Sequence, residues 1–201
     1  MKAYLLNQMV LMIVTAFILM GCHLTATVNR GMLDDNTYYS TSNPNIQIKI
    51  DNAYQHSAKK KGYQHQFVNA ENHRIVFIHY FHPLANETSV DYYEHPDHWI
   101  YANLDGSLEI DRGKMNILGK TWYYRDCFWR PNSASCALMR DLGRFTSRHA
   151  TLKVLFIYQL PLYECNEWMG IMDLTDKQKD TYERFANAFA IDIKFAKFPD
   201  K

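Results

Sequence analysis

Histidine and carboxylate side chains gather between residues 79 and 98, in a composition that suits a transition-metal site. Imidazole and carboxylate groups together bind zinc and related metals. His79 and His82 are three residues apart on a predicted strand, where such positions face opposite sides of a sheet and cannot easily converge. His95, Asp97 and His98 follow in a predicted loop and can converge. These three are the candidate metal ligands; the alternative is that they are ordinary surface histidines and carboxylates.

Three cysteines in the body of the chain offer disulfide chemistry. Cys127 and Cys136 are close in sequence and form the simplest pair, although Cys165 can also pair with either. An oxidising compartment allows such a bridge and leaves one thiol over. Cys127 lies on a predicted strand, without the helix N-terminus or neighbouring base that activates a nucleophilic thiolate. No catalytic residue is therefore predicted.

The N-terminal segment has the form of a secretory signal. Lys2 precedes an apolar run from Met9 to Met20 that is too short to span a membrane, and small Gly21 closes the run. The tetrapeptide L-M-G-C, which ends at Cys22, resembles the lipobox of bacterial lipoprotein precursors. The resemblance implies cleavage before this cysteine, lipidation of its thiol and acylation of the new amino group. The alternative is a signal peptide that is cut elsewhere, or an anchor that is not cut.

The lipobox resemblance also implies a cellular location. Several acyl chains on one residue hold a protein on a bilayer without a spanning helix. In lipoproteins of enteric type, aspartate after the cysteine favours the inner membrane, and His23 stands there instead. We therefore expect the outer membrane, with the folded domain facing the periplasm and the membrane as a partner through the lipid anchor.

Removal of residues 1–21 leaves a chain with equal numbers of basic and acidic side chains. A balanced charge gives no indication of nucleic-acid binding. Residues 22–44 are polar and lack apolar periodicity, which predicts a flexible tether. Residues 45–201 are then one globular domain, long enough for a substantial core.

Alternating apolar residues predict a series of strands. Ile46, Ile48 and Ile50 alternate with polar residues, as in a half-buried strand. The further predicted strands are 63–68, 74–82, 98–103, 107–110, 121–129 and 151–160, with a short strand over 191–195. Strands 74–82 and 151–160 are apolar on both faces, so both faces need to be covered.

Two helices are predicted among these strands. Residues 135–145 hold apolar side chains at near-helical spacing. Near the C-terminus, Thr175 and Gln178 form a capping-box pattern ahead of an apolar stripe that contains Phe185 and Phe189. We expect an α+β fold with a mostly antiparallel sheet of about six or seven strands and two packed helices. The order of a late strand and then a capped amphipathic helix resembles the PsbP/Mog1 family.

Aromatic side chains are dense in two segments of this predicted sheet. Adjacent residues on a strand face opposite ways, so not every ring can enter one core. Tyrosine and tryptophan at a surface make good binding anchors. The candidate binding surface consists of Tyr92, Tyr93, Trp99, Tyr101, Trp122, Tyr124 and Trp129. The alternative is that all of these rings are core.

The chain lacks the G-x-S-x-G, G-x-G-x-x-G, P-loop and H-E-x-x-H motifs. The sequence favours a membrane-anchored periplasmic lipoprotein without a cofactor, which binds or scaffolds an envelope protein as an accessory or an immunity-type inhibitor. The alternative function is an envelope hydrolase, assisted by a metal at His95, Asp97 and His98.

Overall fold

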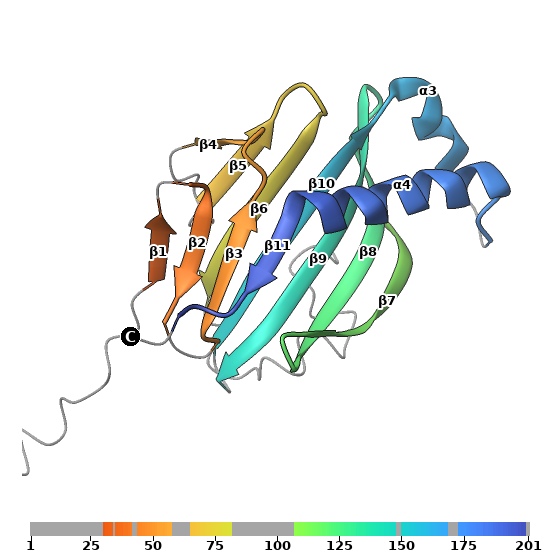
Figure 1. Ribbon diagram of the computed structural model, residues 1–201. Helices are drawn as coiled ribbons and strands as arrows, with labels where there is room; N and C mark the ends of the chain where they lie inside the picture. The colour runs from red at the N-terminus through yellow and green to blue at the C-terminus, as the bar shows by residue number, and fades with distance from the viewer. Residues whose placement is uncertain are drawn as a thin grey trace, which may run out of the picture.

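The computed structural model describes residues 30–33, 35–41, 44–57, 65–81, 107–147, 150–168 and 173–199. These residues form two antiparallel sheets with α-helices packed against them (Figure 1). The strands are β1 (Arg30–Leu33), β2 (Thr37–Ser40), β3 (Ile46–Ile50), β4 (Gln55–Ser57), β5 (His65–Asn69), β6 (Arg74–Phe81), β7 (Ser107–Ile117), β8 (Lys120–Asn132), β9 (Ser135–Ser147), β10 (Ala150–Leu160) and β11 (Ile193–Ala196). The helices are α3 (Leu162–Cys165), the 3-10 turn η2 (Asn166–Trp168) and α4 (Asp176–Asp192).

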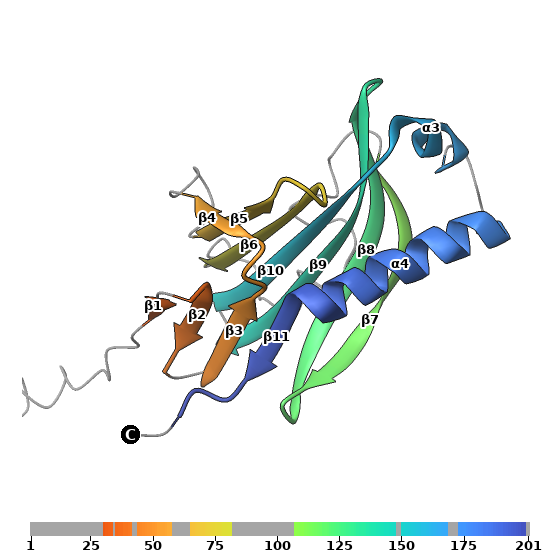
Figure 2. The same ribbon diagram turned by 45° about the horizontal axis from the view of Figure 1, so that its top comes forward.

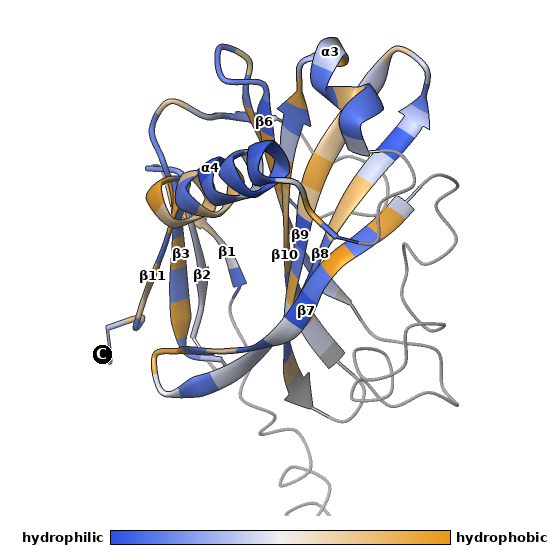
Figure 3. Cartoon of the chain, turned by 90° about the vertical axis from the view of Figure 1, so that its right-hand side faces the viewer, coloured by the Kyte–Doolittle hydropathy of each residue, from blue (hydrophilic) through white to orange (hydrophobic). Residues whose placement is uncertain are grey.

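The smaller sheet has the order β1-β2-β3-β11, and the larger has the order β4-β5-β6-β10-β9-β8-β7. The prediction of a mostly antiparallel fold with a helix near the C-terminus is confirmed, but the single predicted sheet is in fact two. The smaller sheet and α4 lie on the same side of the larger sheet (Figures 1 and 2). Seen from the side, the two sheets face each other (Figure 3).

The main core lies between the two sheets and α4. Ile46, Ile48 and Ile50 of β3 are all buried, as their alternation predicts. They belong to one hydrophobic cluster with Phe156 of β10 and Phe185 of α4, whose ring centroids are 5.6 Å apart. Burial of apolar area on this scale is the main source of folding free energy.

The far face of the larger sheet carries a second cluster. Its buried members are Phe77, Ala137, Met139, Leu155 and Ile157. Neighbouring residues on β6, β9 and β10 thus point into different cores, so these strands are buried on both faces, as predicted for strands 74–82 and 151–160.

Helix α4 begins where the sequence predicts. The Thr175 hydroxyl accepts a hydrogen bond from the Gln178 backbone amide, and the Gln178 side chain accepts one from the Thr175 amide at 2.7 Å. This reciprocal pairing satisfies two amides that have no partner within the helix. The helix buries Phe185 and Phe189 on one face, which accounts for its apolar stripe.

A buried ion pair lies between α4 and the larger sheet. The guanidinium of Arg140 on β9 donates to both carboxylate oxygens of Asp126 on β8, at 2.8 and 2.6 Å. The Tyr182 hydroxyl of α4 donates to the same carboxylate. Arg140 also lies 4.9 Å from the ring centroid of Phe189. The pair therefore fixes helix to sheet through both charge and packing.

The C-terminal end of α4 is fixed by a second carboxylate. Asp192 accepts hydrogen bonds from the Tyr54 hydroxyl at 2.6 Å and from the Arg74 guanidinium at 3.0 Å. Tyr54 follows β3 of the smaller sheet, and Arg74 is the first residue of β6 in the larger sheet. Asp192 therefore connects the helix to segments of both sheets.

The helix predicted over 135–145 is wrong, because these residues form strand β9. Cys136, Leu138 and Leu142 face the main core, whereas Ala137 and Met139 face the second cluster. A strand buried on both faces has apolar residues at mixed spacing, and this spacing imitates the periodicity of a helix.

The tether predicted over 22–44 is also too long, because β1 and β2 lie within it. Thr37, Tyr38 and Ser40 of β2 are buried although two of them are polar. Strand β2 lies between β1 and β3. Its polar composition does not predict a strand. The hydrogen-bonding groups of its backbone are nevertheless satisfied, because β2 pairs with a neighbouring strand on each side.

We predict that Asp126→Asn lowers the free energy of unfolding by about 3–5 kcal/mol, because it leaves the Arg140 charge buried without its partner. Urea denaturation followed by circular dichroism measures this change. Asp180→Ala, on the exposed side of the same helix, should stay within about 0.5 kcal/mol of wild type. Equal stabilities for wild type and Asp126→Asn would show that the pair does not hold the helix.

Candidate functional site

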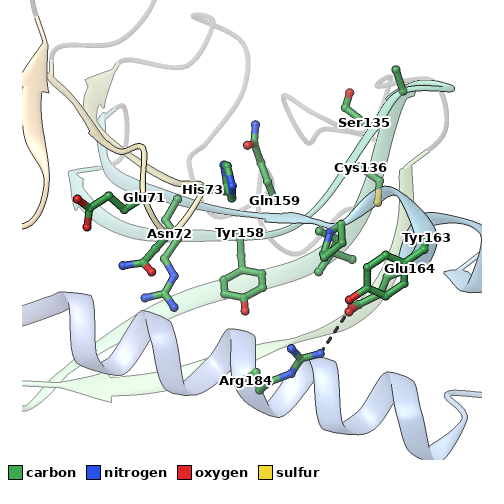
Figure 4. A pocket seen from close by; sticks show the side chains of 14 residues that line it. Glu71, Asn72, His73, Ser135, Cys136, Tyr158, Gln159, Tyr163, Glu164 and Arg184 are labelled. Carbon is green, nitrogen blue, oxygen red and sulfur yellow. Dashed lines mark ion pairs between the residues drawn. The ribbon is translucent and has the colours of Figure 1, made fainter.

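A pocket of about 570 Å³ lies at one end of the larger sheet. Five segments surround it: the β5–β6 turn, the β8–β9 turn, the end of β10, the α3 region and α4 (Figure 4). The lining residues are Glu71, Asn72, His73, Arg74, Ala134, Ser135, Cys136, Tyr158, Gln159, Leu160, Pro161, Tyr163, Glu164 and Arg184. Its size falls within the range of ordinary ligand pockets.

The β5–β6 turn forms one wall and is held by hydrogen bonds. His73 adopts a positive φ of 53°, a conformation in which histidine is enriched among residues other than glycine. The His73 carbonyl accepts a hydrogen bond from the Gln159 amide of β10 at 3.0 Å. The Asn69 side chain accepts one from the Asn72 amide at 3.1 Å. The wall is therefore fixed to the neighbouring strand.

Helix α3 forms the opposite wall and is attached by a disulfide. Cys165 of α3 is bonded to Cys136 at the start of β9, with an S–S distance of 2.05 Å. Trp168 of η2 stacks on Phe128 of the main core at 5.6 Å between ring centroids. This short helical segment thus has two attachments to the larger sheet.

Two exposed hydrophobic side chains lie on α3 beside the pocket. Leu162 is 53% exposed and Tyr163 is 70% exposed. These are among the most exposed large hydrophobic side chains of the described residues. Tyr163 and Arg184 of α4 line the pocket, and Leu162 precedes Tyr163 without lining it. We refer to these three residues together as the α3 rim.

Charges of both signs line the pocket. The Arg184 guanidinium lies 3.6 Å from the buried carboxylate of Glu164, as the dashed line in Figure 4 marks. Arg184 also donates to the Thr181 hydroxyl at 2.9 Å. Arg74 is bound to Asp192, and Glu71 adds a further carboxylate. This balance suits a polar partner of mixed charge better than a polyanion.

Among the described residues, the pocket contains no activated nucleophile. The Ser135 hydroxyl donates to the Asn132 side chain at 3.1 Å, and Cys136 is used in the disulfide. Cys127 lies elsewhere, and burial raises the pKa of its thiol to about 12. A thiol with this pKa stays protonated at neutral pH and is a poor nucleophile.

The disulfide pairs Cys136 with Cys165, and Cys127 is the free, buried thiol. The simplest pair in sequence, Cys127 with Cys136, is therefore not the one that forms. Cys127 of β8 pairs with Met139 of β9, whose side chain belongs to the second cluster. Cys136 belongs to the main core. The two thiols thus belong to different faces of the sheet.

The candidate aromatic surface is not a continuous surface in the described residues. Trp122 is fully buried, which corrects its assignment as a surface anchor. The Tyr124 hydroxyl donates to Asp111 at 2.8 Å, and Trp129 packs against the second cluster. Side chains along β8 alternate between the two faces of the sheet. Trp122 therefore faces the main core, whereas Trp129 faces the opposite side.

Several predicted site residues lie outside the described residues. These are Cys22, Tyr92, Tyr93, His95, Asp97, His98, Trp99 and Tyr101, together with the predicted strand over 98–103. Within the described ranges, no group of three or more histidine, cysteine, aspartate or glutamate side chains is placed to hold a metal ion. None of the described helices is long and apolar enough to cross a membrane.

Sequence reasoning missed the α3 rim. The only local signals were Pro161, which ends strand β10, and the cysteine four residues later. The exposure of Leu162 and Tyr163 depends on where the disulfide holds α3, and the contribution of Arg184 depends on how α4 lies on the sheet.

No protein-family model matches the chain, and no protein of curated function matches it. Solved structures do resemble its fold. The Saccharomyces cerevisiae Ran-binding protein Mog1p aligns with a TM-score of 0.51 and 9% identity, over 86% of this chain and 97% of Mog1p. At this identity the likeness concerns the fold alone. It agrees with the PsbP/Mog1 resemblance expected from the order of the elements.

Two further structures align less well. Cyanobacterial PsbP from Synechocystis has a TM-score of 0.47 and 10% identity, over 85% of this chain and 94% of its own. A protein of unknown function from Pseudomonas aeruginosa has a TM-score of 0.35 and 11% identity, over 74% of this chain and 99% of its own.

We predict that loss of the disulfide destabilises the protein and loosens the α3 wall. The bridged residues are 29 apart, a separation for which chain-entropy estimates give about 3–4 kcal/mol. A Cys136→Ser, Cys165→Ser double variant should show this loss in urea denaturation. A reductant should lower the melting temperature of wild type and not that of the variant. Equal sensitivity of the two proteins would contradict the assigned role.

Proposed function

We propose that the protein is a periplasmic lipoprotein whose folded domain binds an envelope protein without catalysis. The observation that carries the proposal is the α3 rim, in which exposed Tyr163 lines a pocket of mixed charge and exposed Leu162 precedes it on the same short helix. Tyrosine and arginine are the residues that most often dominate the energy of protein interfaces. All three rim residues lie beside a wall that the disulfide fixes, so little ordering is needed on binding.

The composition of the pocket favours a protein side chain as its occupant. A carboxylate and a guanidinium lie 3.6 Å apart in it, and Arg184 is 57% exposed, so it can also reach an acidic group of a partner. An inserted side chain of mixed polarity can contact Tyr158 and Tyr163 while it hydrogen-bonds to His73 or Gln159. Mog1p, whose fold this chain resembles, is a Ran-binding protein and so itself binds a protein. This analogy supports the choice of partner class only.

The position of the pocket suits a tethered binder. In Figure 1 the β5–β6 turn, the β8–β9 turn and α3 lie at one end of the molecule, whereas β1 begins toward the other. A lipid on Cys22 attaches to the chain ahead of β1. An anchored domain can then present the α3 rim away from the bilayer, toward partners that the anchor concentrates nearby.

Capture from membranes tests the binding proposal. We expect the full-length protein to retain one envelope protein, and Tyr163→Ala or Arg184→Ala to reduce the affinity at least tenfold, as for interface hot spots of about 2 kcal/mol. Surface plasmon resonance with the captured partner measures the loss. Ile191→Ala is the matched control, because Ile191 is 62% exposed on α4 but does not line the pocket. Unchanged affinity in both rim variants would exclude the rim as the binding surface.

Mass spectrometry tests the anchor independently. We expect the mature protein to begin at Cys22 and to carry a diacylated thiol and an acylated amino group. A Cys22→Ser protein should lose these lipids and keep its signal segment. An unmodified mature N-terminus at another position would disprove the anchor and leave the binding surface open to its own test.

A further inference from the structure

A second pocket of about 310 Å³ lies at the end of the molecule near the start of β3 and the β7–β8 turn. Ile46, Ile117 and Trp122 supply apolar walls. Lys120, Arg144 and Lys197 add three cations, and no acidic residue lines the pocket. The pocket is therefore apolar within and positively charged around it, in a protein whose overall charge is close to balanced.

Two buried donors of this pocket have no acceptor among the described atoms. They are the indole Nε1 of Trp122, whose side chain is fully buried, and Nε of Arg144. A buried N–H without a partner costs free energy, so such groups in native proteins call for an explanation. Arg144 donates from its Nη1 only to the Thr121 carbonyl at 3.0 Å, and no described carboxylate pairs with it. The Arg144 side chain as a whole is only partly buried, so the rest of its guanidinium can meet an anion in the pocket.

The strand register places this pocket near the start of the folded body. Arg30 lies opposite Ser40, and Ser40 lies opposite Ile46 in the pocket wall. Arg30 is therefore about two strand spacings, roughly 10 Å, from that wall. Cys22 precedes Arg30 by eight residues, which span at most about 29 Å when extended. A lipid anchor at Cys22 thus brings this end of the domain close to the bilayer.

An exposed apolar side chain stands at the tip of the same region. Leu118 is 46% exposed in the β7–β8 turn, at a φ of 54°, beside Gly119 and Lys120. A positive φ is uncommon for leucine. An apolar tip flanked by cations is the arrangement by which peripheral proteins enter the boundary between headgroups and acyl chains.

We infer that this second pocket binds the phosphate of an anionic phospholipid headgroup. The partly exposed guanidinium of Arg144 pairs with the phosphate, Lys120 and Lys197 supply further charge, and Leu118 enters the bilayer surface. The inference rests on the proposed membrane anchor, and it assigns the anchored domain a fixed orientation. The α3 rim then faces away from the bilayer.

Hydrogen exchange of the full-length protein on vesicles tests the site. Vesicles of phosphatidylcholine alone are compared with vesicles that also contain phosphatidylglycerol, and flotation reports attachment to each. We expect amides of residues 117–120 to exchange several-fold more slowly on the anionic vesicles only. Each cation near an anionic surface contributes roughly fivefold in affinity, so Lys120→Gln with Lys197→Gln should weaken docking about 25-fold and abolish the protection.

The matched control is Lys177→Gln with Lys179→Gln, which removes the same charge from exposed positions at the start of α4. This variant should keep the protection. Equal exchange on both vesicle types would overturn the headgroup site and leave the anchor intact. Equal protection on phosphatidylcholine vesicles with added inorganic phosphate would assign the pocket to a free anion instead. A protein that floats with neither vesicle would contradict the anchor and the headgroup site together.

Discussion

The buried pair of Asp126 and Arg140 is the constraint on which the rest of the fold depends. Two opposite charges are removed from water beneath α4, and each is stable there only while the other is present. Tyr182 uses a remaining lone pair of the carboxylate, and the ring of Phe189 lies beside the guanidinium. The hydrogen bonds of this network can all form in only one arrangement of helix and sheet. The network therefore restricts the position of α4 on the sheet more strictly than apolar packing does.

The position of α4 determines both the closure of the core and the shape of the larger pocket. Its inner face closes the space between the sheets with Phe185, while its outer face contributes Arg184 to the pocket. At its C-terminal end, Asp192 binds Arg74, which lines the same pocket from the opposite side. The pocket is therefore a product of long-range contacts, and no short motif in the chain encodes it.

The sequence predicts those parts of the fold that rest on local chemistry. The capping box at Thr175 and the alternation of β3 need only neighbours a few residues away, and both are found as predicted. The sequence of β9 wrongly predicts a helix because the two faces of the strand enter different cores, a property that depends on the packing of distant segments. The α3 rim and the disulfide partner of Cys136 escaped prediction for the same reason. The lipobox that we propose at Cys22 is a local signal of a different kind, since processing enzymes, and not the fold, recognise such a motif.

The free thiol of Cys127 has a consequence for oxidative folding. In an unfolded chain Cys127 and Cys136 are nine residues apart, whereas Cys136 and Cys165 are 29 apart, so the shorter loop closes at a lower entropic cost. A chain that is oxidised before its strands assemble thus favours a bridge that the finished sheet cannot contain, because the two thiols belong to its opposite faces. In an oxidising compartment, correct pairing would then depend on assembly of the β8–β9 hairpin ahead of oxidation, or on an isomerase that corrects the bridge. Once the hairpin forms, burial of Cys127 removes it from further exchange.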